Sequence, residues 1–420
     1  MAFQQGLSGL NATSKDLSVI GNNIANANTY GAKGSRAEFA DLYANAIGGG
    51  GGNSAGIGVT VADVAQQFTQ GNITATENPL DLAINGNGFF QLNAGGATEY
   101  TRNGQFKLDR DGFIVNNQGN QLLGYSADNL GVIQPGLAKP LKLPTSGISP
   151  QGTSTIKMEF NLDARSQTTV PANGAPTNLA DATNYNNATS VVMYDAKGQD
   201  IALTYYFQKA ATDTWNVYIT ANGTPISADA NGNPLASTTI SFPANGGTPT
   251  APVGVVPLTI PATTNSVGAQ TLPITGLTLN LAGATQWGSK FGVTDVTQNG
   301  YAPGQLVGLQ FETNGVVTAR YSNGQTKSAG QVEIANFRNV QGLSPLGGNS
   351  WSRTYSSGEP IVGVPGDGNL GVLQAGALEE SNVDLTAELV NMITAQRVYQ
   401  ANAQTIKTQD QELQTLVNLR

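Results

Sequence analysis

Apolar residues near the C-terminal end of the chain recur at intervals of seven. The members of this series are Leu378, Leu385, Met392, Tyr399, Ile406 and Leu413, and Leu389, Ala403 and Val417 each follow a member by four residues. This spacing places an apolar stripe along one side of an α-helix. No Gly or Pro occurs after Gly376, and Ser381 with Asp384 fits a capping box. The pattern predicts one helix from about residue 382 to the end, roughly 55 Å long at 1.5 Å per residue.

A second apolar stripe lies at the N-terminal end. Its members are Phe3, Leu7, Leu10, Leu17 and Ile24, with Ser14 and Gly21 at the positions that would complete it. The spacing of three, four and seven predicts another amphipathic helix. Either helix alone would expose a long apolar surface, so each needs a partner. The two helices can pair within the chain, or they can pack further against other subunits, and the sequence leaves both readings open.

An amide-rich run begins where the N-terminal stripe ends. It contains Asn22, Asn23, Asn26, Asn28, Gly31 and Gly34. These residue types disfavour a continued helix and suit an extended chain held by side-chain hydrogen bonds. Because Asn and Gly can change hydrogen-bond partners with little strain, the run is expected to act as a linker. The Gly-rich stretch 48–54 that follows is typical of a flexible loop.

Between the two ends the apolar period changes from seven to two. Segments such as "FKLDRDGFIVNNQGNQLLGY" alternate apolar and polar residues and are separated by Asn-Gly, Asp-Gly and Gly-Asn turns, which is the pattern of β-hairpins. From about 147 to 299 the composition shifts to Thr, Pro, Ala and Gly around the hairpin sequence "SVVMYDAKGQDIALTYYFQKAATDTWNVYIT". We interpret this part as an inserted all-β domain, a sandwich or a barrel.

The predicted fold class is mainly β with α-helical, coiled-coil-like termini and nested, discontinuous β domains. The terminal helical domain comprises residues 1–30 and 379–420, and residues 31–75 form a linker or extended arm. The core β domain combines 76–146 with 300–378. The outer β domain, 147–299, is inserted within it.

Composition and charge restrict the partners. Only 11% of the 420 residues are charged, with 20 basic against 28 acidic residues and a formal net charge of −8. So few charges indicate that much of the surface faces other protein. Nucleic acid and anionic membranes are poor partners for an acidic chain without a basic block. No stretch resembles a signal peptide or a membrane span, so we expect either a cytosolic protein or one exported without a cleaved signal.

The residue inventory argues against catalysis. The chain has no His and no Cys, which removes Ser-His dyads, Cys nucleophiles, and imidazole or thiolate metal sites. Asp109 and Asp111 in "KLDRDGF" have a spacing that suits calcium ligands, but the further ligands of a calcium loop are missing, and a polar turn explains them better. We therefore predict no catalytic residue, no metal site and no cofactor.

Both ends of the chain resemble a known family. The segment "LSVIGNNIANANTYGAKGSRAEF" is similar to the N-terminal signature of the bacterial flagellar rod and hook family, and "SNVDLTAELVNMITAQRVYQANAQTIKTQDQELQTLVNL" is similar to its C-terminal helix. The segment "QGNITATENPLDLAINGNGFFQL" resembles the core β domain of this family. Within the family, the inserted hairpin and the segment "GLSPLGGNSWSRTYSSGEP" resemble hook subunits. Rod subunits are shorter and fit the large insertion less well. The loop around 246–275 departs from shorter hook subunits.

This resemblance implies a structural subunit that polymerises into a short curved tube, a universal joint passing motor torque from rod to filament. The two apolar stripes would form subunit contacts, and the amide-rich run would let neighbours slide. Implied partners are further copies of the chain, the distal rod protein, the hook cap protein, the hook-filament junction proteins and the flagellar export apparatus. The location implied is the extracellular hook on the basal body. A distal rod or junction subunit, and a secreted β-rich adhesin, are the alternatives.

Overall fold

The computed structural model describes residues 2–42, 56, 58–128 and 130–418. The described chain divides into two compact units. Unit 1 comprises the described residues of Met1–Thr145, Gly308–Arg320 and Thr326–Arg420, and unit 2 comprises Ser146–Val307 with Tyr321–Gln325. Unit 2 is thus an insertion in the sequence of unit 1. The finer division of unit 1 into helical, linker and β parts stays a prediction, and the loop expected at 48–54 lies outside the described residues.

One helix lies at each end of the described chain, α1 (Ala2–Ala25) and α2 (Leu385–Asn418), and both belong to unit 1. The mainly β fold class with helical termini is therefore confirmed. Helix α2 begins at Leu385 because the Asp384 carboxylate accepts hydrogen bonds from the backbone N–H groups of Thr386 and Ala387, at 2.9 and 3.1 Å. The capping residue is therefore Asp384, and the capping box predicted from Ser381 is wrong. The Ser381 hydroxyl instead accepts from the N–H of Val383.

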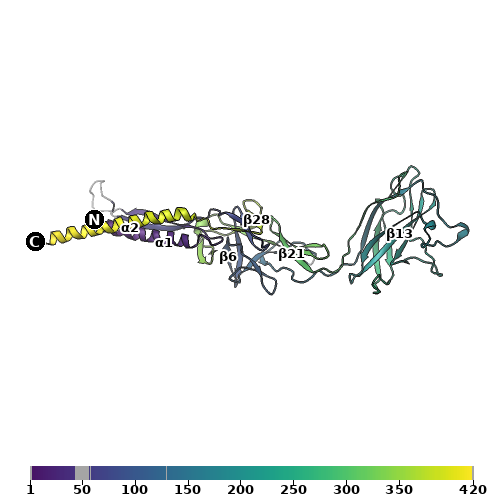
Figure 1. Cartoon of the computed structure of the whole chain (residues 1–420), viewed down its shortest axis with the longest axis horizontal. Coiled ribbons are helices and arrows are strands. Elements are labelled where there is room, and N and C mark those ends of the chain that lie inside the picture. Colours follow the sequence, from purple (N-terminus) through teal and green to yellow (C-terminus); the bar gives the residue numbers. More distant parts are fainter. Residues whose placement is uncertain (1, 43–55, 57, 129, 419–420) are drawn as a thin grey trace. The chain divides into compact units, whose positions relative to one another are not determined.

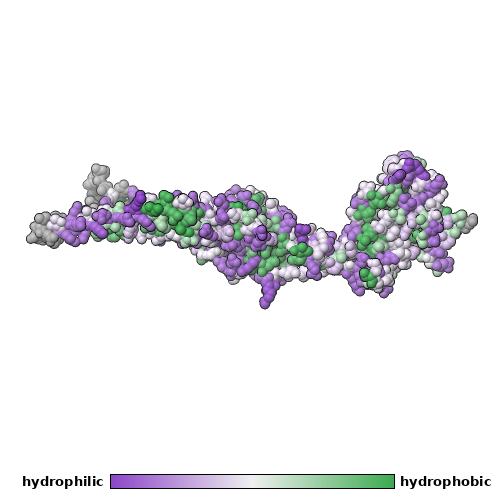
Figure 2. All heavy atoms as spheres, viewed as in Figure 1, coloured by the Kyte–Doolittle hydropathy of each residue, from purple (hydrophilic) through white to green (hydrophobic). Residues whose placement is uncertain are grey.

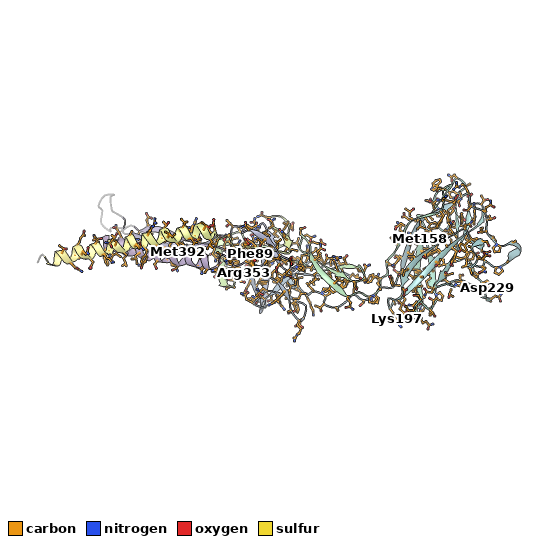
Figure 3. The ribbon with its side chains drawn as sticks, in the orientation of Figure 1. Phe89, Met158, Lys197, Asp229, Arg353 and Met392 are labelled. Atoms are coloured by element: carbon orange, nitrogen blue, oxygen red, sulfur yellow. The ribbon has the colours of Figure 1, made fainter. Side chains whose placement is uncertain are left out.

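The β part of unit 1 is built around a 13-stranded sheet. Eight of its strands are hydrogen-bonded side by side in the order β21-β22-β23-β9-β5-β6-β26-β25. Strand β1 pairs with β2 in an antiparallel ribbon, and β4 and β3 pair with β28 and β29. A buried cluster that includes Leu82, Phe90, Leu122 and Ile334 forms the main core. A second cluster surrounds Phe89, which Figure 3 labels. Figure 1 shows the helices next to these strands, with β6, β21 and β28 labelled.

The strands of unit 1 have the following bounds: β1 (Ser35–Leu42), β2 (Gly58–Gln66), β3 (Ile73–Ala75), β4 (Leu82–Asn85), β5 (Phe89–Ala94), β6 (Ala97–Thr101), β7 (Lys107–Leu108), β8 (Ile114–Val115), β9 (Gln121–Ser126), β10 (Lys139–Pro140), β23 (Thr326–Val332), β24 (Ile334–Asn336), β25 (Ser344–Gly347), β26 (Ser350–Ser352), β27 (Ile361–Gly363), β28 (Val372–Ala375) and β29 (Ala377–Glu379). Strands β21 (Leu306–Phe311) and β22 (Val316–Tyr321) contain the division between the units, and η3 (Val340–Gly342) is a short 3-10 helix.

Unit 2 consists of two five-stranded sheets that share one core. The first contains β11 (Thr155–Asp163), β17 (Val255–Ile260), β18 (Ile274–Asn280), β19 (Thr285–Trp287) and β20 (Gly292–Gln298). The second contains β12 (Asn187–Tyr194), β13 (Asp200–Ala211), β14 (Thr214–Ala221), β15 (Thr224–Pro225) and β16 (Thr238–Ser241). Two short 3-10 helices, η1 (Ala172–Gly174) and η2 (Ala182–Asn184), complete the unit.

The core of unit 2 follows directly from the period-two pattern. Along β13 the buried positions Ile201, Leu203, Tyr205 and Phe207 alternate with more exposed ones. The Phe207 ring lies 4.7 Å from that of Phe160 on β11, so the two sheets meet across this core. Met158, labelled in Figure 3, lies in the same cluster. The predicted hairpin sequence is the antiparallel meander β12-β13-β14.

Six turns in the described chain are closed in the same way. At Asp109 the carboxylate accepts the N–H groups of Asp111 and Phe113, at 2.9 and 2.7 Å, and the N–H of Gly112 donates to the Asp109 carbonyl. Gly112 has a φ of 87°, which favours glycine. Equivalent turns begin at Asn116, Asp128, Asp195, Asp229 and Asn265. The turn interpretation of Asp109 and Asp111 is confirmed.

Candidate functional site

The terminal helices pack against each other through small residues. A Cβ atom added to Gly6 would lie 3.1 Å from the Ile406 side chain, and one added to Gly9 would lie 2.9 Å from the Asn402 amide. Near the other end of α1, the Asn23 amide donates to the Glu388 carboxylate at 3.1 Å. The helices are therefore antiparallel. Because Gly6 and Gly9 form the α1 side of this contact, the helices approach closely, and Ile406 of α2 packs directly on Gly6.

The predicted N-terminal stripe is not the buried side of α1. Phe3 and Leu7 are each 45% exposed, and Leu10, Leu17 and Ile24 are only half-buried. The side chains that α1 buries form a different set: Ala12, Thr13, Val19, Ile20 and Asn23. At 100° per residue this set lies partly toward α2 and partly toward β1 and β2, which also pack on α1. The stripe runs along the edge of the helix pair.

The heptad series on α2 lies only partly in the helix contact, where Ile406 packs on Gly6. Met392 and Ile406 are half-buried, whereas Leu385, Tyr399 and Leu413 are exposed, and Leu389 is exposed as well. Met392, labelled in Figure 3, is the second member of the series on α2. The α2 side chain that is buried in the described structure is Ala395, which does not belong to the series. The side chain of Val417 lies outside the described residues.

An apolar patch remains on the outer side of α2. It consists of Leu385, Leu389, Val390 and Ile393, all of which are exposed. Figure 2 shows hydrophobic residues gathered over this first part of the helix. We call these four residues the outer patch. Contiguous apolar surface of this kind is typical of a site that another protein covers.

The amide-rich run is held more tightly at some residues than a sliding linker requires. The buried Asn23 side chain accepts from the Ser35 N–H at 2.8 Å and donates to the Ser35 carbonyl at 2.7 Å. Gly31 is buried, with a φ of 70°, and its N–H donates to the Glu379 carbonyl at 2.8 Å. Gly34 donates to the Asn382 side chain at 2.8 Å. These three residues fix the run in place.

The side chains of the other three linker residues are exposed or form hydrogen bonds only within this group. Asn26 donates through its side-chain amide to the Asn22 carbonyl at 2.9 Å. Asn22 and Asn28 are exposed. Any exchange of hydrogen-bond partners is therefore confined to this subset. Helix α1 also extends into the amide-rich run, because Asn22 and Asn23 still belong to it although Asn disfavours a helix.

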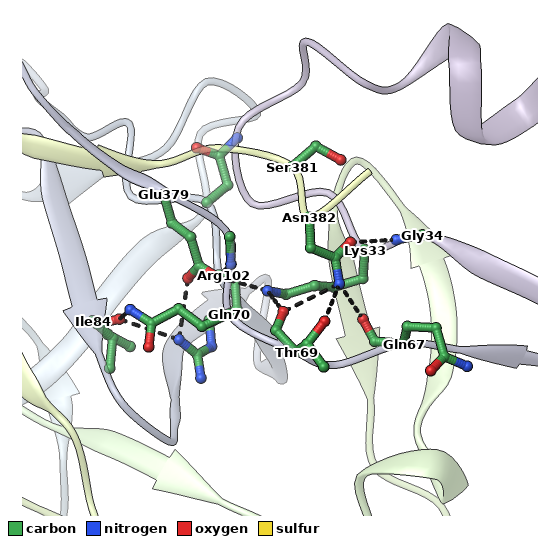
Figure 4. A network of polar contacts seen from close by, with 12 residues as sticks. Lys33, Gly34, Gln67, Thr69, Gln70, Ile84, Arg102, Glu379, Ser381 and Asn382 are labelled. Atoms are coloured by element: carbon green, nitrogen blue, oxygen red, sulfur yellow. Dashed lines mark hydrogen bonds and ion pairs between the residues drawn. The ribbon is translucent and has the colours of Figure 1, made fainter. Parts of the chain in front are cut away.

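A buried charge cluster anchors the root of α2 to the β part of unit 1. Figure 4 shows Glu379 between two cations. Its carboxylate is 2.6 Å from the Lys33 Nζ and 3.1 Å from the Arg102 guanidinium, and all three side chains are buried. Burial lowers the pKa of Lys33 and of Arg102, while the carboxylate opposes that shift in both. Lys33 also donates to the Thr69 carbonyl at 2.8 Å. One carboxylate thus joins three distant parts of the sequence.

Asn382 forms the second anchor, also visible in Figure 4. Its amide donates to the Gln67 carbonyl at 2.7 Å and to the Thr69 hydroxyl at 2.8 Å, while its oxygen accepts from Gly34. Sequence reasoning did not single out Lys33, Arg102, Glu379 or Asn382. A usable signal existed for Lys33, which is the only charged residue in an amide-rich run of an otherwise weakly charged chain.

The described residues offer little for chemistry. They contain no group of three or more acidic, His or Cys side chains arranged to hold a metal ion. Neither described helix combines the length and apolarity needed to cross a membrane. The notable features of this region are its uncovered apolar surfaces and the buried polar anchors beneath them.

Four family models match the chain. Residues 3–33 match "Flagella basal body rod protein", and residues 83–175 match "Flagellar hook protein FlgE/F/G D1 domain". Residues 161–301 match "Flagellar basal body protein FlaE D2 domain", and residues 374–419 match "Flagellar basal body rod FlgEFG protein C-terminal". The matches therefore cover both helical ends and both β parts.

Whole-length relatives are similar throughout. The flagellar hook protein FlgE of Escherichia coli (strain K12) is 45% identical over 424 residues, covering 100% of both chains. The flagellar hook protein FlgE of Borreliella burgdorferi is 32% identical over 453 residues, covering 100% of this chain and 99% of the relative. The crystal structure of Helicobacter pylori flagellar hook protein FlgE2 has a TM-score of 0.51 at 15% identity, covering 73% of this chain and 100% of that chain. This last likeness concerns the fold alone.

Proposed function

This chain belongs to the flagellar hook protein family, and from that premise we propose that it is a structural subunit of the bacterial flagellar hook. Copies of the chain polymerise into a short curved helical tube, which acts as a universal joint passing motor torque from rod to filament. The observation that carries this proposal is the uncovered apolar surface of the helix pair. Phe3, Leu7 and the outer patch are exposed although the two helices already pack together.

Apolar helix surfaces of this size favour association. Burying apolar area contributes roughly 25 cal/mol per Å², so several leucine-sized side chains together stabilise a subunit contact by several kcal/mol. The predicted packing residues that lie on the surface, such as Leu389, Tyr399 and Leu413, are available for such contacts. In this proposal the intramolecular helix pair and the contacts between subunits coexist, because they use different sides of the helices.

The linker has a narrower role than its composition suggested. Asn23, Gly31 and Gly34 hold the run against the root of α2, so they keep each subunit rigid as the tube bends. Asn22, Asn26 and Asn28 are the residues that can exchange partners with a sliding neighbour. Replacing Asn26 and Asn28 with Ala is expected to change the bending stiffness of the assembled tube, measured from its thermal curvature fluctuations. Unchanged stiffness would refute the sliding role.

The remaining expectations follow from family membership. The protein has a structural role with no catalytic residue and no cofactor, and it does not bind nucleic acid or insert into membranes. Its partners are further copies of itself, the distal rod protein, the hook cap protein, the hook-filament junction proteins and the export apparatus. It works in the extracellular hook attached to the basal body.

A distal rod or junction subunit is the second candidate. The matches of residues 3–33 and 374–419 to rod-protein models fit this candidate as well as the first, because these ends are shared by rod and hook subunits. Tube shape separates the two functions, since a rod subunit is expected to give straight tubes and a hook subunit curved ones. A secreted β-rich adhesin fits less well, because it would have no use for uncovered apolar helices.

The deciding experiment compares the full-length chain with a truncation that ends at Asp384. The truncation retains Asn382 and Glu379, so the anchors at the root of α2 stay in place. Negative-stain electron microscopy after seeded or salt-promoted polymerisation is expected to reveal curved tubes from the full-length chain only. Circular dichroism should still record β-unit melting in the truncation. Tubes from both proteins, or from neither, would contradict the proposed role of α2 in assembly.

A further inference from the structure

A groove opens between α1, the β1-β2 ribbon and the first half of α2. Its volume is about 960 Å³, and its lining includes Ala12, Val19, Phe39, Ala387, Ala395 and Val398. The lining mixes these apolar side chains with polar ones such as Thr13 and Asn391, and its alanines give the helices a low surface here. The groove is therefore wide enough for a row of larger side chains that this chain does not itself supply.

The groove and the outer patch lie on different sides of α2. Measured around the helix axis from Ala395 at 100° per residue, the groove residues Ala387 and Val398 lie about 60–80° to one side. Counted in the opposite sense, the four outer-patch residues span about 80–220°, which places the patch mainly on the side of α2 that faces away from Ala395. One subunit can therefore use its groove and its outer patch at the same time, toward two different neighbours.

The charges around the two surfaces are complementary. Asp16, Asp384 and Glu388 contribute acidic groups to the groove, and Arg36 on its wall already pairs with Glu38 at 2.6 Å. Burial raises the pKa of Asp16, which has no ion pair within the described part of the chain. A nearby cation would relieve this cost.

The outer patch carries a cation in a suitable position. Arg397 follows Ile393 by one helical turn and lies on the same side of α2. It is exposed and forms no ion pair with any described residue. An apolar helix face that ends in an arginine thus matches a groove whose lining combines apolar side chains with acidic groups.

We propose that the groove of one subunit receives the outer patch of α2 from a second copy of this chain, with the incoming Arg397 next to the acidic groups. The inference rests on the proposed function and names the contact through which the helices assemble. The patch is about 12 Å long and the groove follows α2 for about 27 Å, so the patch fits within it. Because the two surfaces differ, the contact is head-to-tail and extends into an open polymer.

Two substitutions test the two surfaces separately in the full-length chain. Ile393→Glu places a charge in the outer patch, and Ala387→Trp fills the groove with a bulky side chain. Both positions are exposed, so neither change disturbs a packed core. Each variant alone is expected to raise the concentration needed for seeded polymerisation by about tenfold or more, because a buried charge or a steric clash costs over 1.4 kcal/mol. Val192→Glu, a similarly exposed aliphatic position in unit 2, is the matched control and should polymerise normally.

Mixing the two variants gives the sharpest readout. The Ile393→Glu variant keeps an intact groove, and the Ala387→Trp variant keeps an intact patch. An equimolar mixture should therefore form one-to-one dimers that cannot grow, detected by analytical ultracentrifugation, while each variant alone stays monomeric. Melting of the β units, followed by circular dichroism, checks that both variants are folded.

The outcomes separate this inference from the proposed function. If both variants form tubes as readily as the unaltered chain, the groove contact is wrong while the hook function stands. Long tubes from the mixture would likewise overturn the head-to-tail contact. If the unaltered chain forms no tubes under any seeded condition, the proposed function fails and this inference fails with it.

Discussion

Unit 2 buries its large apolar residues within the subunit, whereas the terminal helices leave many of theirs exposed. The strands of unit 2 point Tyr205, Phe207 and Trp215 into a core that the unit closes by itself. The helices α1 and α2 meet through glycines, and their larger apolar residues, such as Leu7 and Leu389, stay on the surface. An apolar residue in unit 2 therefore stabilises the single subunit, whereas one on the outer side of a helix can do so only after assembly.

The difference shows that periodicity identifies an element but does not identify its partner. Alternation on a strand leaves two faces, and a second sheet can cover one of them. A helix has a continuous circumference, so small residues can take the contact side while the apolar stripe stays free. The same kind of apolar pattern thus leads to a core in one region and to a binding surface in the other.

The largest expected effect lies in the unit 2 core. Trp215 is fully buried, and its indole N–H donates to Gln286 at 2.7 Å. Trp215→Ala leaves a cavity and an unpaired buried amide oxygen on Gln286, so it should lower the free energy of unfolding by about 3–5 kcal/mol. Urea denaturation of the full chain, followed by far-UV circular dichroism, measures this change. The neighbouring Trp287, 52% exposed, is the control, and Trp287→Ala should cost less than about 1 kcal/mol. Equal losses would mean that unit 2 does not depend on its own core.

The buried cluster tests where the helical region is fixed within a single subunit. Glu379→Ala leaves Lys33 and Arg102 buried without their carboxylate, which should destabilise unit 1 by about 3–5 kcal/mol. Thermal unfolding of the monomer records the change. The control is Glu38→Ala, which breaks an exposed pair with Arg36 and should cost no more than about 1 kcal/mol. A small effect of Glu379→Ala would show that the root of α2 is not anchored in the monomer.

Two glycines near the N-terminus should respond to alanine with opposite signs. At Gly31 the φ is 70° and an added Cβ would lie 2.5 Å from the Asn103 nitrogen, so Gly31→Ala should destabilise the monomer by about 1–3 kcal/mol. At Gly21, within α1, an added Cβ meets no atom within 4 Å. Gly21→Ala should therefore stabilise the helix by about 0.5–1 kcal/mol. Differential scanning calorimetry measures both, and a neutral Gly31→Ala would mean that the linker is free to move.

Local patterns were sufficient for the elements and for one of the cores. Alternation predicted the meander around Trp215, and heptad spacing predicted α2, because both depend on residues close together in the sequence. The turn at Asp109 was predictable for the same reason, since its carboxylate bonds within five residues.

Contacts between distant residues could not be predicted in this way. Glu379 meets Lys33 across 346 positions and Arg102 across 277, and no periodicity connects them. The side of α2 that contacts α1 was only partly predicted, because Ile406 belongs to the heptad series whereas Asn402, and Gly9 which it meets on α1, carry no hydrophobic signal. Residue type alone likewise did not separate the fixed Asn23 from the exposed Asn28 within one amide-rich run.

The smallest expected effect is the most direct test of the comparison. Ile393 is 53% exposed on the outer side of α2, so Ile393→Ala should change the unfolding free energy of the monomer by less than about 0.5 kcal/mol. The same urea denaturation used for Trp215→Ala measures it, at a concentration too low for assembly. A loss of more than 1 kcal/mol would mean that this side of α2 is already covered in the monomer. Unit 2 and the helices would then both bury their apolar residues within the subunit. The outer patch would have no exposed apolar area with which to bind a second subunit.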